Sequence, residues 1–151
     1  MSRIRSRDTT IELEVRKRLY AIGLRYRLRS KLPGHPDVVF PGKKVAVFIH
    51  GCFWHMHGCR LSALPSTRSA YWLDKLRGNK RRDAQAAESL KQMGWKIVTV
   101  WECNLKKHPS QEITRITEAV RGSEGTPRYK QANFNLGAKD FIAKITCAYH
   151  P

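Results

Sequence analysis

The chain has 151 residues and a mass of 17.4 kDa, which suits one domain with a single core and is too short for two full domains. Its 41% hydrophobic and 9% aromatic residues are typical of a globular protein and exclude global disorder, collagen-like repeats and a coiled-coil rod. The 29 Lys and Arg residues against 12 Asp and Glu give a net charge of +17, so we expect a polyanionic partner, with nucleic acid ahead of an anionic membrane surface.

The sequence shows no membrane or export signal. No apolar run approaches the roughly 20 residues that span a bilayer, and the N-terminus has no apolar signal-peptide segment. We therefore expect a cytoplasmic protein that does not bind membranes. In such a chain, cysteines predict metal ligands or buried thiols rather than disulfides. The cysteines are Cys52, Cys59, Cys103 and Cys147.

The first predicted elements are a helix and a hairpin. After a basic arm at residues 1–8, Thr9 and Glu12 have the spacing of a capping box, and apolar residues at helical spacing predict a helix over about residues 10–22. Short β-like runs follow at residues 26–28, 37–40 and 45–49. The Pro-Gly-Lys sequence at 41–43 suits a tight turn, so the last two runs should form a hairpin.

The middle of the chain predicts a loop and two helices. Residues 50–66 lack helical or strand periodicity and indicate an ordered loop that is not held by a β-ladder. Thr67 can cap a helix that continues through Leu76. A second helical stripe stops at Gly94, a C-terminal signal. This stripe consists of Ala84, Ala87, Leu90 and Met93.

The last predicted elements are a buried strand at residues 96–101 and a helix that begins at Ser110 and ends before Gly122. One face of that helix carries Ile113, Ile116 and Val120. This order of helices and strands indicates an α/β layer fold, with a mixed sheet flanked by helices. Residues 123–151 form a tail of unassigned role, in which Cys147 suits a small core side chain rather than a ligand.

The densest chemical stretch is residues 50–59, His-Gly-Cys-Phe-Trp-His-Met-His-Gly-Cys. A structural zinc ion takes four Cys or His ligands in a tetrahedron. Cys52, His57 and Cys59 are close enough in sequence to supply three ligands from one loop, and Cys103, after a predicted strand, can supply the fourth. The spacing is not that of a standard zinc finger, so buried free thiols beside surface histidines are the alternative.

Asp37 opens a predicted strand, and a carboxylate at a strand edge suits a catalytic Mg²⁺. The hairpin should bring Asp37 close to Ile49 and His50 at the end of the partner strand. In phosphodiester hydrolysis a histidine such as His50 or His55 can take the proton of the attacking water. The alternatives are a turn carboxylate at Asp37, a purely capping role for Glu12 and a core histidine at His50.

Three motifs resemble those of the very-short-patch mismatch repair endonucleases (Vsr): Gly-His-Pro-Asp at 34–37, the Phe-to-Cys stretch at 48–59 and Trp-Glu-Cys at 101–103. The resemblance covers about residues 8–103. It implies a single restriction-endonuclease-like domain with a structural zinc site, which makes a Mg²⁺-dependent nick on the 5′ side of the thymine in a T·G mismatch. Such mismatches arise when 5-methylcytosine deaminates, so a functional link to a cytosine-5 DNA methyltransferase is also implied.

Carried over residue by residue, the resemblance makes Asp37 a Mg²⁺ ligand, Ile49 a Mg²⁺ contact through its backbone carbonyl, and His55 the general base, with His50 and Glu12 assisting. The Zn²⁺ ligands would be Cys52, His57, Cys59 and Cys103. Restriction-like nucleases usually carry an acidic-x-Lys element where this chain has Phe-Ile-His at 48–50, so the chemistry relies on imidazole. Some family members have Thr at position 49; Ile keeps the carbonyl and loses the hydroxyl.

Two adjacent aromatic residues, Phe53 and Trp54, lie inside the Cys/His stretch, and the resemblance favours their insertion into DNA together with Trp72. Apolar wedges favour mismatches because unstacking costs less where pairing is already disturbed. The alternative is that the aromatic rings pack under the loop. The other candidate DNA contacts are Lys75, Asn79, Arg82 and Asp83, with Arg77, Lys80 and Arg81 adding affinity for phosphates.

A mismatch-specific nicking endonuclease is therefore the first expectation, acting as a monomer on double-stranded DNA at the nucleoid of a bacterial-type cell. One rival is a zinc-stapled DNA-binding module without catalysis. A second is a restriction or defence nuclease that cuts matched DNA. The residue types at Asp37, His50 and His55 favour an enzyme over the binding module.

Overall fold

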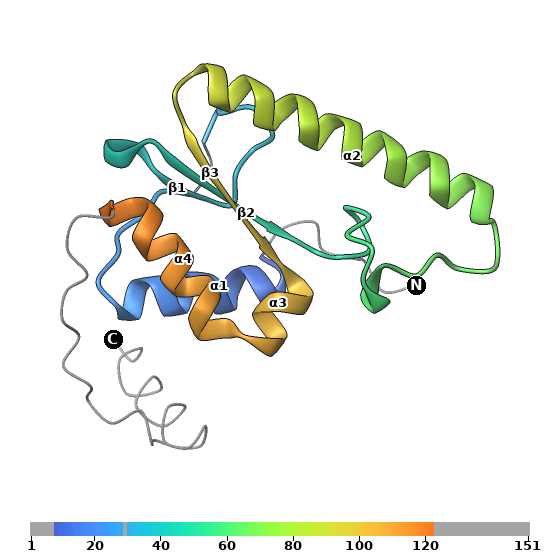
Figure 1. Ribbon diagram of the computed structural model, residues 1–151, viewed down its shortest axis with the longest axis horizontal. Coiled ribbons are helices and arrows are strands. Elements are labelled where there is room, and N and C mark those ends of the chain that lie inside the picture. The colour runs from blue at the N-terminus through green and yellow to red at the C-terminus, as the bar shows by residue number, and fades with distance from the viewer. Residues whose placement is uncertain (1–7, 29, 123–151) are drawn as a thin grey trace.

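The computed structural model describes residues 8–28 and 30–122 (Figure 1). The elements are α1 (Thr10–Ala21), β1 (Val38–Phe40), β2 (Val45–His50), α2 (Ser69–Gln92), β3 (Lys96–Trp101), α3 (Glu102–Lys107) and α4 (Pro109–Arg121), with short 3-10 turns at Pro41–Lys43 and Arg60–Ser62. The basic arm up to residue 7, the tail at 123–151 and Cys147 lie outside the described residues. Among the described helices, none is long and apolar enough to cross a membrane.

The three strands form one mixed sheet in the order β1-β2-β3. β1 pairs antiparallel with β2, as the hairpin prediction requires, and β2 pairs parallel with β3. A parallel pair needs a long crossover connection, and α2 supplies it. Figure 1 shows α2 over one face of the sheet and α1 and α4 over the other. The predicted mixed sheet flanked by helices is therefore confirmed.

The main hydrophobic core lies between the sheet and the helices α1 and α4. Side chains alternate between the two faces of a strand, so Val45, Val47 and Ile49 of β2 face this core. The same alternation places Phe48 and His50 on the opposite face, under α2. The core also contains Val15 and Leu19 of α1, Val38 and Phe40 of β1, Val98 and Val100 of β3, and Ile113, Ile116 and Val120 of α4.

The region from Ser69 to Gln92 is one continuous helix of 24 residues, where the sequence predicted two. Its first helical residue follows Arg68, which has a positive φ of 53° and no side-chain cap, so the cap predicted at Thr67 is wrong. Gly78 costs only about 1 kcal/mol relative to alanine inside a helix. Burial of Leu76, Ala86 and Leu90 outweighs that cost.

Other boundaries also differ from the predictions. The run at residues 26–28 contributes only an isolated bridge from Arg27 to Val39. The helix expected to begin at Ser110 begins one residue earlier, at Pro109, and α3 was not predicted. On α2, Ala84 and Met93 are exposed, so they are not part of the buried face.

Candidate active site and metal centre

Asp37 lies immediately before β1 and contacts the neighbouring strand. One carboxylate oxygen, Oδ2, accepts a 2.7 Å hydrogen bond from the backbone N–H of Ile49. The predicted proximity of Asp37 to the end of β2 is thus confirmed. Burial, and then the nearby Glu12 carboxylate, raise the pKa of Asp37 to about 6, against the opposing effects of the Ile49 hydrogen bond, Arg16 and His55. A bound cation would relieve the cost of this buried charge.

His50 and His55 form a stacked pair beside Asp83. Their ring centroids lie 3.7 Å apart with an interplanar angle of 1°. His55 Nδ1 lies 2.6 Å from Asp83 Oδ2. Because a carboxylate only accepts hydrogen bonds, this contact places the hydrogen on Nδ1 and leaves Nε2 as an acceptor. Burial, and then the charge of His55, lower the pKa of His50 to about 4, so His50 is neutral at pH 7.

His50, His55 and Asp83 lie close enough together to be considered as a metal site, since their ligand atoms are within 4.8 Å of one another. Ring nitrogens bind metals through lone pairs in the plane of the ring. In two parallel stacked rings these lone pairs cannot converge on one ion. The arrangement therefore suits proton transfer at a neutral imidazole better than metal binding. It forms one wall of a cavity of about 270 Å³ between α2 and the sheet.

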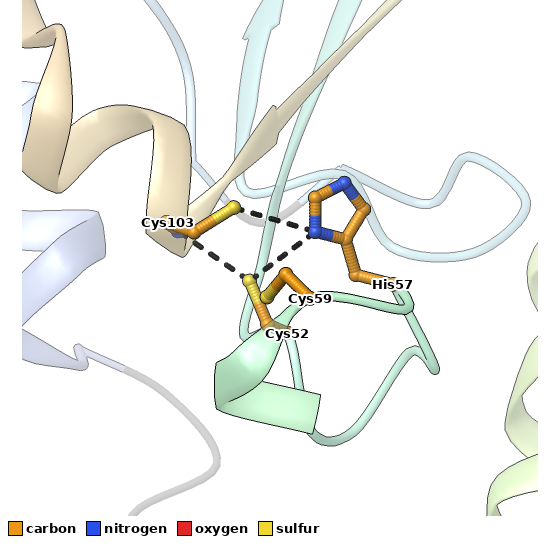
Figure 2. Close-up of side chains that lie close together, drawn as sticks. All are labelled: Cys52, His57, Cys59 and Cys103. Carbon is orange, nitrogen blue, oxygen red and sulfur yellow. Dashed lines mark hydrogen bonds between the residues drawn. The ribbon is translucent and has the colours of Figure 1, made fainter. Parts of the chain in front are cut away.

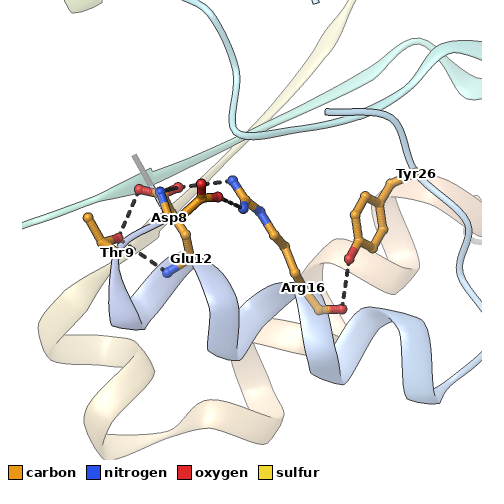
Figure 3. Close-up of polar contacts among 5 residues, drawn as sticks. All are labelled: Asp8, Thr9, Glu12, Arg16 and Tyr26. Atoms are coloured by element: carbon orange, nitrogen blue, oxygen red, sulfur yellow. Dashed lines mark hydrogen bonds and ion pairs between the residues drawn. The ribbon is translucent and has the colours of Figure 1, made fainter. Parts of the chain in front are cut away.

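Glu12 is buried at the start of α1, and its hydrogen bonds with other described residues are all local (Figure 3). Its Oε1 accepts from the Thr9 hydroxyl at 2.8 Å, and its Oε2 accepts from the Asp8 N–H at 3.0 Å and from Arg16 at 2.9 Å. The Thr9 side chain accepts from the Glu12 N–H, so half of the predicted capping box exists, whereas the Glu12 carboxylate accepts from the Asp8 N–H in place of the Thr9 N–H. Glu12 nevertheless also acts on Asp37, whose pKa it raises.

The four predicted zinc ligands come together at the end of β3 (Figure 2). All their ligand atoms lie within 4.8 Å of one another. His57 Nδ1 is 3.6 Å from Cys52 Sγ and 3.3 Å from Cys103 Sγ. A tetrahedral zinc ion with ordinary bond lengths separates a sulfur and a nitrogen ligand by about 3.5 Å. Three sulfurs and one imidazole at this spacing fit a structural zinc ion.

Cys52 is the fully buried member of this cluster. This burial raises the pKa of its thiol to about 12. Without a cation the sulfur stays protonated, whereas a bound metal deprotonates a coordinating thiol. The alternative of free thiols beside surface histidines does not fit the geometry, because His57 lies among the sulfurs. Cys103 also donates its backbone N–H to Cys52 Sγ at 3.4 Å.

The aromatic residues form a cluster between the loop after β2 and the start of α2. Phe53, Trp54 and Trp72 contact one another edge to face, with centroids 5.1 to 5.9 Å apart. Tyr71 extends the cluster from Trp72 and is 58% exposed. The Lys75 Nζ lies 5.6 to 5.9 Å from the rings of Trp54, Tyr71 and Trp72. The rings are partly exposed rather than enclosed under the loop.

Two of the candidate DNA contacts on α2 have partners inside the protein. Asn79 donates to the backbone carbonyl of Trp54 at 3.1 Å and accepts from Arg82. Asp83 holds His55. In this geometry Asn79 supports the aromatic loop and Asp83 supports a histidine. The basic residues around them are all exposed on α2; these are Lys75, Arg77, Lys80, Arg81 and Arg82.

Sequence reasoning missed three parts of this site. The Asp83–His55 contact joins residues 28 positions apart, which no local pattern reveals. Trp101 ends the strand that was predicted to be buried, but it is only half-buried and stacks on His57. The ion pair of Arg16 with Glu12 has the i,i+4 spacing of a helical pair and could have been found.

Comparison with known proteins identifies close relatives. The family model "DNA mismatch endonuclease Vsr" matches residues 1–61. The "Type II nicking enzyme V.XorIIP" of Xanthomonas oryzae is 46% identical over 106 residues, 70% of this chain and 78% of that relative. The "DNA mismatch endonuclease Vsr" of Escherichia coli is 39% identical over 121 residues, 80% of this chain and 78% of the relative. The "Type II nicking enzyme V.NmeAIP" of Neisseria meningitidis is 42% identical over 124 residues, 80% and 89% respectively.

Proposed function

The chain belongs to the Vsr family of DNA mismatch endonucleases, and from this premise we propose that it nicks duplex DNA on the 5′ side of the thymine in a T·G mismatch. The relatives named as nicking enzymes support cleavage of one strand. The observation that carries the proposal is the site itself. The site contains Asp37, which accepts a hydrogen bond from the Ile49 N–H, and the His55–Asp83 pair. An aromatic cluster and the exposed basic residues of α2 lie beside them.

Asp37 and Ile49 are the proposed Mg²⁺ contacts. Carboxylate and carbonyl oxygens are the hard donors that Mg²⁺ prefers. The N–H and C=O groups of one strand residue point to the same side of the strand. Since the Ile49 N–H points to Asp37, its carbonyl faces the same side, beyond the start of β1 at Val38. When bound there, Mg²⁺ would polarise the scissile phosphate and stabilise the leaving oxygen.

His55 is the proposed general base. Asp83 keeps the hydrogen on Nδ1, so Nε2 is free to take a proton from the attacking water. His50, neutral at pH 7, stacks on His55 without adding a competing charge, and it can donate or accept a hydrogen bond at the phosphate. Glu12 assists by its charge close to Asp37.

Asp83→Asn is expected to lower the single-turnover cleavage rate by about 10²- to 10⁴-fold, with DNA affinity little changed. An asparagine can turn its NH₂ group towards His55 Nδ1 and so favour the tautomer with hydrogen on Nε2, which cannot act as a base. The measurement is single-turnover cleavage of a T·G duplex, paired with a binding titration. Asp74→Asn, an exposed aspartate on the same helix, is the matched control. Unchanged cleavage by Asp83→Asn would remove the base assignment from His55.

The exposed basic residues of α2 are the proposed phosphate contacts. With about five phosphate contacts, the affinity for duplex DNA is expected to fall by on the order of 10²- to 10³-fold between 50 and 200 mM salt. The variant Arg77→Gln with Arg81→Gln should reduce the slope of log affinity against log salt by about two. Lys91→Gln, about 15 Å further along the helix, is the control and should leave the slope unchanged. An unchanged slope in the double variant contradicts this contact surface.

The cluster of Cys52, His57, Cys59 and Cys103 is the proposed site of a structural Zn²⁺, which would fix the loop that carries Phe53 and Trp54. A loop that is already rigid would lose less conformational entropy when its aromatic rings insert between the bases at a mismatch. The three-stranded mixed sheet agrees with a restriction-endonuclease-like domain, which we propose as the fold. We also propose a monomer and a functional link to a cytosine-5 DNA methyltransferase, because the substrate follows from 5-methylcytosine deamination.

The proposed substrate is tested with two end-labelled duplexes that differ only in a T·G or a T·A pair. Each is incubated with the protein in Mg²⁺ or in EDTA. We expect Mg²⁺-dependent cleavage of the T·G duplex alone. Equal cleavage of both duplexes would indicate a restriction-type nuclease, and binding without cleavage would indicate a DNA-binding module.

A further inference from the structure

Trp101, the last residue of β3, lies between the two centres described above. Its ring stacks on His57, with centroids 4.2 Å apart and an interplanar angle of 16°. It also meets His50 and His55 edge to face, at centroid distances of 5.2 Å and 6.5 Å. Trp101 therefore contacts one residue of the Cys/His cluster and both candidate catalytic histidines. Its half-buried ring lines the cavity next to them, away from the main core.

The backbone fixes Trp101 to both centres. In the parallel pairing of β2 and β3, Trp101 is directly in register with His50. Two residues later, Cys103 contributes its sulfur to the cluster, 3.3 Å from His57 Nδ1. The end of β3 and the start of α3 thus carry the indole and a sulfur of the Cys/His cluster within three residues. A shift of the cluster would move Trp101, and a shift of Trp101 would move His50.

His50 depends on ring contacts for its orientation. Asp83 holds His55 by a hydrogen bond, whereas within residues 8–28 and 30–122 the ring contacts of His50 are with Phe48, His55 and Trp101, and the Asp83 carboxylate lies within 4.8 Å of a His50 ring nitrogen. Hydrogen bonds or metal bonds commonly fix a catalytic imidazole. For His50 the stack on His55 and the edge-to-face contact with Trp101 take this part.

We infer that Trp101 is a positioning residue that transmits the orientation of His57, set by the Cys/His metal centre, to the catalytic pair of His50 and His55. The inference rests on the proposed nicking function. It gives the metal centre a role in catalysis beyond stability and beyond holding the aromatic loop. A ring that only filled space could be replaced by another apolar side chain of similar volume without loss of rate.

The test uses four variants. Trp101→Leu removes the stack on His57 and the edge contacts, and Trp101→Phe restores an aromatic ring. His57→Cys removes the imidazole but keeps a metal ligand, because Nδ1 is the ring nitrogen nearer to the backbone and a cysteine sulfur can take its place. Trp95→Leu is the matched control, since Trp95 lines a different cavity beside Val39 and Pro41.

The measurements are zinc content, affinity for a T·G duplex, and the single-turnover rate at saturating protein. Trp101→Leu is expected to keep its zinc and bind DNA within about threefold of wild type, but to cleave about 10- to 100-fold more slowly. Trp101→Phe should recover most of the rate, and Trp95→Leu should match wild type. The double variant of Trp101→Leu with His57→Cys should be no slower than the slower single variant, because both remove the same link.

Several outcomes would overturn the inference: a wild-type rate for Trp101→Leu, loss of its zinc, or rate losses that multiply in the double variant. A structural readout separates this test from the proposed function. In His57→Cys the NMR signal of the His55 Nδ1–H, bonded to Asp83, should shift, although His57 stacks on neither catalytic histidine. If the wild-type protein cuts no duplex, the proposed function fails. The shift of the His55 Nδ1–H signal then still tests whether Trp101 connects His57 to the histidine pair. If His57→Cys binds no zinc, the rates of Trp101→Leu and Trp101→Phe decide it.

Discussion

Replacing Asp37 by asparagine is expected to reduce cleavage of a T·G duplex by at least about 10²- to 10³-fold, the usual loss when one preorganised electrostatic contact is removed. Asparagine keeps an oxygen that can accept the Ile49 N–H, so the fold at the start of β1 should persist. It has no negative charge for Mg²⁺. Affinity for DNA in EDTA should stay within a few fold of wild type, because the proposed phosphate contacts lie on α2 and not at Asp37.

The same variant has a predicted effect on stability that does not depend on activity. The folded-state pKa of Asp37 is about 6, above its ordinary 3.8. Because the pKa is higher in the folded state, protonation of Asp37 stabilises the folded protein. This contribution to the free energy of unfolding is complete below pH 3.8 and is lost as the pH rises through 6. At pH 8 in EDTA, asparagine removes a buried charge and should raise the free energy of unfolding by up to about 3 kcal/mol, for a pKa difference of about two.

Urea unfolding at several pH values checks this result. In EDTA the free energy of unfolding of Asp37→Asn should exceed that of wild type at pH 8 and equal it at pH 3.5. Addition of Mg²⁺ at pH 8 should stabilise wild type and leave the variant unchanged. Cleavage by Asp37→Asn at the wild-type rate, or Mg²⁺ stabilisation of the variant equal to that of wild type, would contradict the metal assignment.

Cys103→Ser is expected to have the largest effect on stability. A structural zinc ion contributes roughly 10–16 kcal/mol to folding in small zinc domains, and loss of one ligand sacrifices part of it. Cys103 also joins β3 to the loop through its N–H on Cys52 Sγ. We expect the zinc content to fall from one per chain towards zero and the midpoint of thermal unfolding to fall by about 10 °C or more.

Zinc analysis of the purified protein and thermal unfolding measure both effects. Cys147→Ser is the control, since Cys147 is predicted not to be a ligand, and it should keep both zinc and stability. Chelation of the wild-type protein should reproduce the lower midpoint of Cys103→Ser. A full zinc content in Cys103→Ser, with an unchanged midpoint, would show that the four side chains do not form the metal centre.

The candidate site could be predicted from sequence where its residues are close in the chain or fixed by a hairpin. Cys52, His57 and Cys59 belong to one loop, and Asp37 faces Ile49 because the short turn at Pro41–Lys43 sets the register of β1 and β2. Asp83 could not be assigned in this way. Its role depends on how the middle of α2 packs against the loop after β2, which is a tertiary packing result.

The fold was predictable where periodicity was strong. The buried faces of α1 and α4 repeat at helical spacing, and β2 and β3 are apolar runs. Prediction failed where local signals conflict with packing. The pattern predicted one helix through Leu76 and a second with a stripe from Ala84, yet α2 is continuous because both of its halves contact the rest of the protein. The short α3 has too few residues for a periodic pattern.

Strand-resolved cleavage of a single duplex tests the central claim most directly. The duplex carries one T·G mismatch and a different label on each strand, and the products are sized next to a sequence ladder in Mg²⁺. The account predicts one nick, in the strand that carries the mismatched thymine and on its 5′ side, with the guanine strand intact. Cuts in both strands, or a nick whose position does not move when the mismatch is moved, would contradict it.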